Sequence, residues 1–218
     1  MAKDNLMYEP VKWFNRKAAE KCVEALKQNG FDAYYAETRE EAKKIVLDAI
    51  PAGASVGVGG SVTVRELGIP QALKERGNRV YDHWDASLSP AEKAAARDSQ
   101  VRADVFLSSA NALTMDGVLV NTDGTGNRVA SMIFGPKMSI VVCGRNKIVP
   151  SVRDAVRRIR TYAAPINYKR LNAKAPCAGG GDCEACKPKL CAITAVIAAK
   201  PAAKEKFLVV IVGEDLGY

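Results

Sequence analysis

The sequence predicts an α/β fold, with a mostly parallel sheet flanked by helices. Short apolar runs, typical of buried strands, alternate with amphipathic segments, typical of helices, over most of the chain. The chain has 218 residues, of which 48% are hydrophobic, and this is enough for one large domain with a sizeable core. We therefore expect a single domain over residues 1–218, with a Cys-rich segment at 173–192 inserted before the last strand.

Capping residues, glycines and prolines mark the ends of the predicted helices. Thr38 with Glu41, and Ser89 with Glu92, have the spacing of capping boxes, and Ser151 opens a later helix. The predicted helices, in chain order, cover residues 11–28, 38–49, 64–67, 71–76, 89–102, 128–134 and 151–163.

The predicted strands are short apolar runs that end at glycine, proline or polar residues. In chain order they cover residues 31–36, 54–58, 79–81, 104–107, 138–143 and 207–212. The Asp116-Gly117 step predicts a tight turn that folds Leu113 back onto residues 118–120 as a β-hairpin. Residues 192–204 are rich in alanine, and we assign no strand to them.

The composition narrows the classes of function. No apolar run reaches the roughly 18 residues of a membrane span, and the N-terminus lacks the apolar region of a secretory signal, so we expect a cytoplasmic protein. The formal net charge is +8, but the basic residues are not interleaved with aromatic residues, so nucleic acid is not expected. A basic pocket for a small anion, or a basic face for an acidic protein, fits this balance better. The single histidine, His83, argues against a zinc hydrolase or a Ser-His-Asp hydrolase.

Polar loops follow three of the predicted strands, at 59–63, 116–128 and 144–147. In parallel sheets, ligands bind outside the carboxyl ends of the strands. The first loop offers backbone N–H groups and hydroxyls that suit a phosphate or carboxylate, from Gly59, Gly60, Ser61 and Thr63. It has neither a Walker A sequence nor the full dinucleotide-binding spacing. A tight turn between a strand and a helix explains the same residues.

The other two loops hold the candidate catalytic groups. Asp116 and Asp123 are candidate general bases, and Asn121 and Arg128 are candidate substrate-binding residues. An Asp before a Gly is also a common turn residue, so a purely structural role for both carboxylates remains open. In the third loop, Arg145 and Lys147 are placed to pair with an anion or to stabilise a developing enolate, which assigns Lys147 a catalytic role and Arg145 a binding role.

Four cysteines are crowded into one short segment with the spacing C-x5-C-x2-C-x4-C: Cys177, Cys183, Cys186 and Cys191. In a cytoplasmic chain this pattern indicates metal or redox chemistry rather than structural disulfides. Four thiolates suit tetrahedral zinc or a cubane iron–sulfur cluster. The full spacing matches neither a standard zinc ribbon nor the usual bacterial ferredoxin run, and reversible disulfides or free thiols remain alternatives.

Together these motifs resemble the LUD family, the lactate utilization proteins formerly called DUF162. The resemblance covers nearly the whole chain. Its blocks are VGVGGSVTVRELGI (56–69), DVFLSSANALTMDGVLVNTDGTGNRVASMIFGP (104–136), IVVCGRNKIV (140–149) and VVIVGEDLGY (209–218). It implies a fold similar to the phosphosugar isomerase and CoA-transferase superfamily. It also implies a role in oxidising L-lactate to pyruvate with iron–sulfur partner subunits. The Cys-rich segment occurs in only part of this family.

We therefore expect a lactate-utilization-type protein, an oxidoreductase component that binds a small anion at the strand-end loops. Association with iron–sulfur proteins favours a [4Fe–4S] cluster over zinc at the four cysteines. One alternative is an isomerase or transferase acting on a phosphosugar or CoA ester, with Asp116 or Glu66 as base or nucleophile. Another is a non-catalytic subunit that docks on an iron–sulfur partner through a basic face. The sequence leaves open whether the chain is catalytic alone and whether it forms a homo-oligomer.

Overall fold

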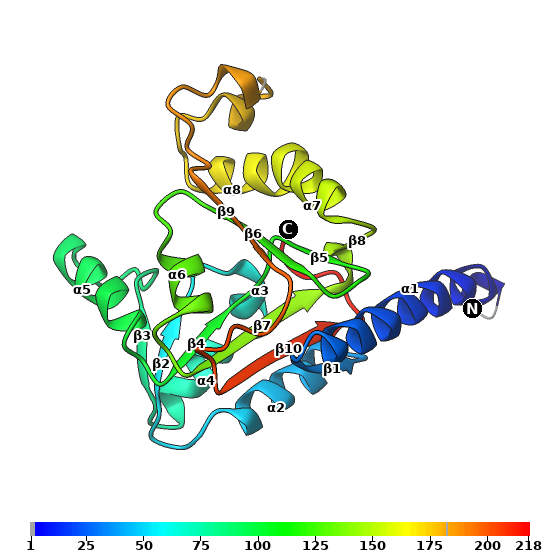
Figure 1. Cartoon of the computed structure of the whole chain (residues 1–218), viewed down its shortest axis with the longest axis horizontal. Helices are drawn as coiled ribbons and strands as arrows, with labels where there is room; N and C mark the ends of the chain where they lie inside the picture. The colour runs from blue at the N-terminus through cyan, green and yellow to red at the C-terminus, as the bar shows by residue number, and fades with distance from the viewer. Residues whose placement is uncertain (1–2, 182) are drawn as a thin grey trace.

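The main sheet has six strands, all parallel, in the order β1-β10-β7-β4-β2-β3 (Figure 1). The computed structural model describes residues 3–181 and 183–218. The strands are β1 (Asp32–Ala36), β2 (Ser55–Val58), β3 (Arg79–Asp82), β4 (Val105–Ser108), β7 (Met138–Gly144) and β10 (Lys206–Val212). The α/β fold with a parallel sheet, predicted from the alternation of apolar and amphipathic segments, is confirmed.

The helices begin close to their predicted caps. The predicted caps Thr38, Ser89 and Ser151 each accept a hydrogen bond from a backbone N–H in the first turn of their helix, and Ser61 does so without having been predicted. Ser89 and Glu92 form the full capping box that the spacing predicts. The helices are α1 (Lys3–Gln28), α2 (Arg39–Ala49), α3 (Val62–Glu66), α4 (Ile69–Glu75), α5 (Pro90–Gln100), α6 (Asn127–Ile133), α7 (Val152–Arg158) and α8 (Ala164–Arg170).

A second, smaller sheet has the order β8-β5-β6-β9. Its strands are β5 (Ala112–Thr114), β6 (Leu119–Asp123), β8 (Ile148–Val149) and β9 (Ile193–Ile197). Strands β5 and β6 are antiparallel and joined at Gly117, which has a φ of 78°, so the predicted hairpin is confirmed. The pairing of β6 with β9 joins residues some 70 positions apart, and local patterns do not reveal it.

Both faces of the main sheet are covered. On one face, Leu107 and Ile140 pack with residues of α2, α3 and α4. On the other, Phe106 and Val209 pack with residues of α1, α6 and the second sheet, whose far side contacts α7. Because the central strands are buried on both faces, their sequences are nearly continuous apolar runs rather than alternating ones.

Three elements differ from the expectation. Helix α1 begins at Lys3 rather than at residue 11, with Pro10 inside it. The helix predicted to end at 163 passes through a π-helical turn, Ile159–Ala163, into α8. This places Pro165 in the first turn of α8, where its missing N–H is tolerated. Strand β9 lies in the Ala-rich stretch and buries only Ile197 well, so it has a weak apolar signal.

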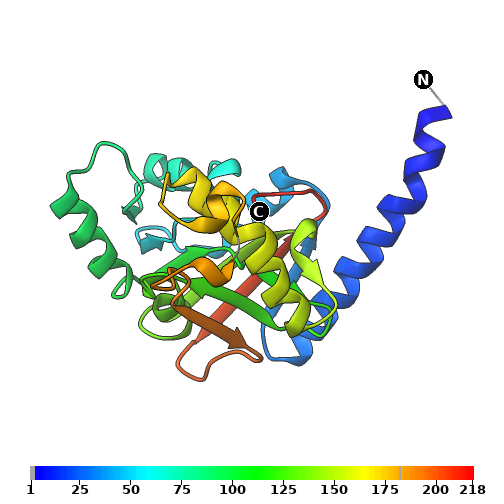
Figure 2. The same ribbon diagram turned by 90° about the horizontal axis from the view of Figure 1, so that it is seen from above.

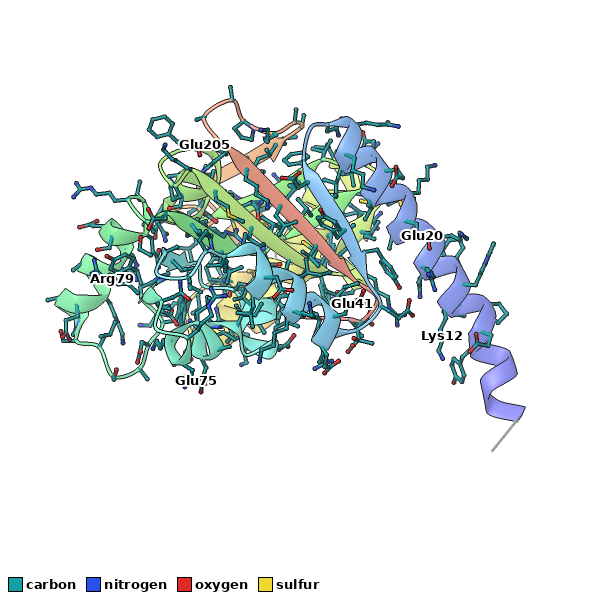
Figure 3. The ribbon with its side chains drawn as sticks, turned by 90° about the horizontal axis from the view of Figure 1, so that it is seen from below. Lys12, Glu20, Glu41, Glu75, Arg79 and Glu205 are labelled. Carbon is teal, nitrogen blue, oxygen red and sulfur yellow. The ribbon has the colours of Figure 1, made fainter. Side chains whose placement is uncertain are left out.

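The carboxyl edge of the main sheet is covered by other elements, which we call the roof. In Figure 1, α7, α8 and the Cys-rich segment after them lie above this edge. In Figure 2, the N-terminal part of α1 extends away from the rest of the protein. Figure 3 shows Lys12 on this extension of α1. Glu41 and Glu75 lie on α2 and α4, which cover the face of the main sheet opposite to the one that α1 covers. No helix in the described ranges is long and apolar enough to cross a membrane.

Gly117 allows the hairpin to touch α1, which predicts a large cost of substitution. A Cβ at Gly117 would lie 2.6 Å from the backbone nitrogen of Leu26. We expect Gly117→Ala to lower the free energy of unfolding by about 3 kcal/mol, because a clash adds to the strain of a positive φ. Gly53 has a similar φ of 76° and open space around it, so the control Gly53→Ala should cost only about 1 kcal/mol. Equal losses in urea denaturation would show that the close approach to α1 is unimportant.

Candidate anion-binding site

A cleft of about 650 Å³ lies at the carboxyl edge of the main sheet. Its floor comes from loops that follow β2, β3, β4 and β7, and its roof from α8 and the end of the Cys-rich segment. Because parallel strands end at one edge, the topology brings together loops far apart in the sequence. Among the sequence-predicted residues, the cleft is lined by Gly60, Ser61, Thr63, Asp123, Arg128, Lys147 and Cys191.

Lys147 is the central group of the cleft. It ends the short 3₁₀ turn, Arg145–Lys147, that follows the fully buried strand β7, and only 3% of the residue is exposed. Its Nζ donates hydrogen bonds to Thr63 Oγ1 and Ser109 Oγ, both at 2.9 Å. Within the described ranges no carboxylate forms an ion pair with it. The structure therefore holds a buried ammonium group by hydroxyls rather than by an opposite charge.

Burial changes the acidity of this lysine. It lowers the pKa of Lys147 to about 8, because the charged form loses its hydration. Cys143 opposes this effect, the nearby cations Arg158 and Arg128 lower the pKa further, and the more weakly coupled carboxylate of Glu66 raises it. A lysine with a pKa near the physiological range is suited to binding an anion, to proton transfer or to nucleophilic attack.

The glycine loop shapes the floor beside Lys147. A Cβ on Gly60 would lie 2.3 Å from Trp84 Nε1, so only glycine lets this indole pack over the loop. Gly59 does not line the cleft. It packs closely against β4, where a Cβ would lie 2.8 Å from Ser108 Oγ. Ser61 Oγ already accepts the N–H of Val64 as a helix cap. Because α3 has only five residues, its dipole adds little, and the hydroxyls matter more than the helix.

Arg128 is held in the cleft by acceptors on three sides. Its guanidinium pairs with Asp123 at 2.6 Å and donates to Asn111 Oδ1 at 2.7 Å and to the carbonyl of Thr122 at 2.8 Å. Asp123 also accepts the N–H of Val129. The carboxylate is thus engaged on both oxygens, and it positions Arg128 rather than serving as a free base. The side chain of Arg128 keeps 19% of its surface exposed, where a ligand can reach it.

Asp116, Asn121 and Arg145, which were also predicted for the anion site, do not line the cleft. Asp116 is in the hairpin turn, where its carboxylate accepts the hydroxyl of Thr114. Asn121 is fully buried within strand β6, and its Oδ1 accepts the N–H of Asn111. Arg145 turns away and pairs with Asp215 at 2.9 Å. The structure therefore does not bring these side chains to Lys147, because each points away from its strand-end loop.

The roof contributes residues that the sequence analysis did not identify. The Arg170 guanidinium stacks 4.5 Å from the centroid of the Trp84 ring and bonds to Tyr218 and Asn167. This network joins α8, the loop after β3 and the end of the chain across one side of the cleft. Arg170 was missed because the predicted helix stopped before it. Ser109 was missed although it lies two residues after the predicted strand 104–107, and this position was the available signal.

His83 lies in the cleft wall as a neutral group. Burial and the charge of Arg97 lower the pKa of His83 to about 4. The Gln100 amide nitrogen, 2.8 Å away, donates to Nδ1. The same amide donates to the carbonyl of Val58 at 2.7 Å, which ties the imidazole to the end of β2. His83 is therefore a packed residue rather than a base poised near neutral pH.

The four cysteines of the roof segment lie within electrostatic range of one another. Burial raises the pKa of Cys177, and the neighbouring Cys191 raises it further. Cys191 Sγ lies 3.6 Å from the hydroxyl of Tyr168, and both residues line the cleft. All four are free thiols. In the part of the chain that the structure describes, no three potential ligands are assembled around one point for a metal ion.

Comparisons with known proteins agree on one family. The family model described as the LUD domain matches residues 19–212. The chain is similar in structure to a DUF162 family protein from Deinococcus radiodurans, with a TM-score of 0.52 and 17% sequence identity over 91% of this chain and 98% of that one. At this identity the likeness concerns the fold alone. No curated protein shows significant similarity to the chain.

Burial of Lys147 predicts a specific pH dependence of stability. The pKa is about 8 in the folded chain against an ordinary 10.5, so between these values the unfolded chain binds more protons. Stability therefore rises with pH in this window. Relative to Lys147→Met, the wild type should gain roughly 2 kcal/mol of unfolding free energy between about pH 7 and 10, at about 1.4 kcal/mol per pKa unit.

Urea denaturation across this pH range measures the effect. Lys204, whose pKa burial also lowers to about 8, is present in both proteins and cancels. The exposed Lys137→Met serves as the control and should follow the wild type. Parallel curves for the wild type and Lys147→Met would contradict the buried, shifted ammonium.

Proposed function

This chain belongs to the LUD domain family, and from that premise we propose that it binds a small carboxylate or phosphate-bearing anion in the cleft, within a system that oxidises L-lactate to pyruvate. Lys147 and Arg128 are the proposed charge partners of the ligand, and the hydroxyls of Ser61, Thr63 and Ser109 surround them. Membership of the family supports the proposed role in lactate utilization. The geometry of the cleft supports the proposed binding of an anion.

The observation that carries this proposal is the unpaired ammonium of Lys147. A buried charge without a counter-ion is costly, and an incoming anion would offset that cost. The other charged side chains that line the cleft are mostly positive as well. Of the described side chains that line it, only that of Asp123 is acidic, whereas five are basic: Arg97, Arg128, Lys147, Arg170 and Lys189. Since Asp123 is neutralised by Arg128, the field in the cleft favours a negative ligand.

The proposed ligand fits the hydrogen-bonding capacity of the cleft. Lys147 uses two of its three N–H donors on hydroxyls, which leaves one for a carboxylate oxygen. Ser109 and Thr63 lie on the two sides of Nζ and would be within reach of the same ligand. Oxidation of lactate releases two electrons, and iron–sulfur centres are the acceptors that we propose for them, in partner subunits or on this chain.

We further propose that Cys177, Cys183, Cys186 and Cys191 hold a [4Fe–4S] cluster, with zinc as the alternative metal. Four thiols within 15 residues match the donor set of either centre. Their mutual electrostatic influence supports the proposal. Because the thiols are not assembled around one point in the described residues, binding would have to draw the segment together. A cluster here would carry electrons at the edge of the cleft, beside Cys191.

The anion site predicts that Lys147 dominates affinity. Titration calorimetry with L-lactate, pyruvate and inorganic phosphate should show binding of at least one of these anions. Lys147→Met should weaken that binding by roughly 10- to 100-fold, the range of a lost charged hydrogen bond of about 1.5–3 kcal/mol. Lys137→Met, which removes a surface charge at the opposite edge of the sheet, should bind as the wild type does. Unchanged affinity in Lys147→Met would refute the assignment.

The cysteine site predicts metal in protein purified without oxygen. We expect about four iron atoms and matching sulfide per chain, as a cubane requires, and loss of this iron in Cys183→Ser and Cys186→Ser. Cys22→Ser is the matched control, because this buried thiol lies on α1, outside the segment. Zinc in place of iron would assign the segment a structural role. Absence of both metals would contradict the proposal.

A further inference from the structure

Among the residues whose burial the structure describes, two lysines are deeply buried, and their partners differ in kind. Lys204 is 2% exposed, and its Nζ donates to the backbone carbonyls of Ser131, Phe134 and Pro136. Carbonyls only accept hydrogen bonds, so this arrangement favours the charged ammonium, which caps the end of α6. Lys204 does not line the cleft.

Lys147 is equally buried, but its two partners are hydroxyls. Both hydroxyls accept from Nζ, and each donates its own proton to a backbone carbonyl at 3.3 Å, Thr63 to Leu216 and Ser109 to Ala110. Rotation of either hydroxyl away from this long bond would let it donate to a neutral amine instead. The site therefore supports both protonation states of Nζ. Burial lowers the pKa of both lysines to about 8, so the two differ in their partners and in access to the cleft rather than in acidity. Unlike Lys204, Lys147 opens onto a cleft that suits a small anion.

A neutral amine at the wall of a cationic cleft is suited to covalent attack on a carbonyl. The ligand must carry a carboxylate for Arg128 and a carbonyl carbon within reach of Nζ. Acids with the carbonyl next to the carboxylate meet both requirements in one small molecule. We infer that Lys147 forms an imine with the C2 carbonyl of a small 2-oxo acid held in the cleft. This inference rests on the proposed anion site and names its substrate class.

The reaction balances without an added oxidant or reductant. The lone pair of Nζ forms the C–N bond, and the carbonyl oxygen takes a proton to give a carbinolamine. The C–O bond then breaks, and one water molecule leaves as the C=N bond forms. Ser109 Oγ, at 2.9 Å from Nζ, is placed to pass the proton between nitrogen and oxygen, and Thr63 Oγ1 holds the other side of Nζ.

The protonated imine has a chemical consequence. It replaces the ammonium by another cation, so the charge of the cleft is kept while electrons are drawn from the adjacent C3 carbon. Protons on C3 of the bound 2-oxo acid become more acidic and exchange with solvent. The cleft would thus activate the carbon next to the carbonyl, which is a different chemistry from removal of hydride at C2.

Reductive trapping tests the inference on the full chain, purified without oxygen. Pyruvate and sodium cyanoborohydride are added to the wild type, and the modified lysine is located by peptide mass spectrometry. We expect one reduced pyruvate adduct, on Lys147, and none on Lys204, which is the internal control for a buried lysine. L-Lactate, which has no carbonyl, should bind without giving an adduct.

Variants separate attack from positioning. Lys147→Arg keeps a positive charge but cannot form the imine, so it should lose the adduct, and calorimetry measures how much of the pyruvate affinity it keeps. Ser109→Ala should trap pyruvate at least tenfold more slowly, because the proton relay is removed. Proton NMR in D₂O gives a second readout, since the methyl signal of pyruvate should decay with the wild type and persist with Lys147→Arg.

Each outcome has one meaning for the inference. An adduct confined to Lys147, with methyl exchange that depends on it, supports the imine. Pyruvate binding by calorimetry without adduct or exchange overturns the imine and leaves the anion site intact. No binding and no adduct would overturn both. Adducts spread over surface lysines, with Lys147 no faster than the others, would also overturn the imine.

Discussion

The burial of one ammonium group at the end of β7 is the constraint on which the site depends. Removing Lys147 from water costs several kcal/mol unless polar atoms replace its hydration. Helix α3, which follows β2, supplies Thr63, and the loop after β4 supplies Ser109, so three adjacent strands must end together. The parallel order of the sheet, the glycine loop and the chain end that packs on Thr63 are arranged around this group. A cleft for anions follows from the same constraint.

The fold was largely predictable because its signals are local. Capping serines, apolar runs and the Asp116-Gly117 turn depend on neighbouring residues, and the structure has helices, strands and the hairpin where these signals predict them. The misses have a different origin. The pairing of β9 with β6 and the continuation of a helix past Pro165 depend on tertiary contacts or on a π-helical turn, and neither leaves a periodic pattern in a short segment.

The candidate site was predictable in position more than in detail. Thr63, Arg128 and Lys147 come shortly after strands in the sequence, and the structure places all three in the wall of the cleft. The direction in which a loop side chain turns is set by its hydrogen-bond partners, and sequence does not reveal these. Asp116 faces its own hairpin, and Arg145 faces Asp215. Ser109 gained its importance only from the distance between its Oγ and the lysine.

The roof of the cleft connects the proposed metal site of the cysteine segment with the proposed anion site, which are distant in the sequence. Lys189, Leu190 and Cys191 belong to the cysteine segment and also line the cleft. Any centre that gathers the thiols therefore moves part of the wall that a ligand touches. Such coupling is thermodynamically reciprocal: if the oxidation or metal state of the segment changes affinity for the ligand by some factor, the ligand changes the occupancy or potential of that centre by the same free energy. The fold thus provides a route for redox state and ligand occupancy to regulate one another.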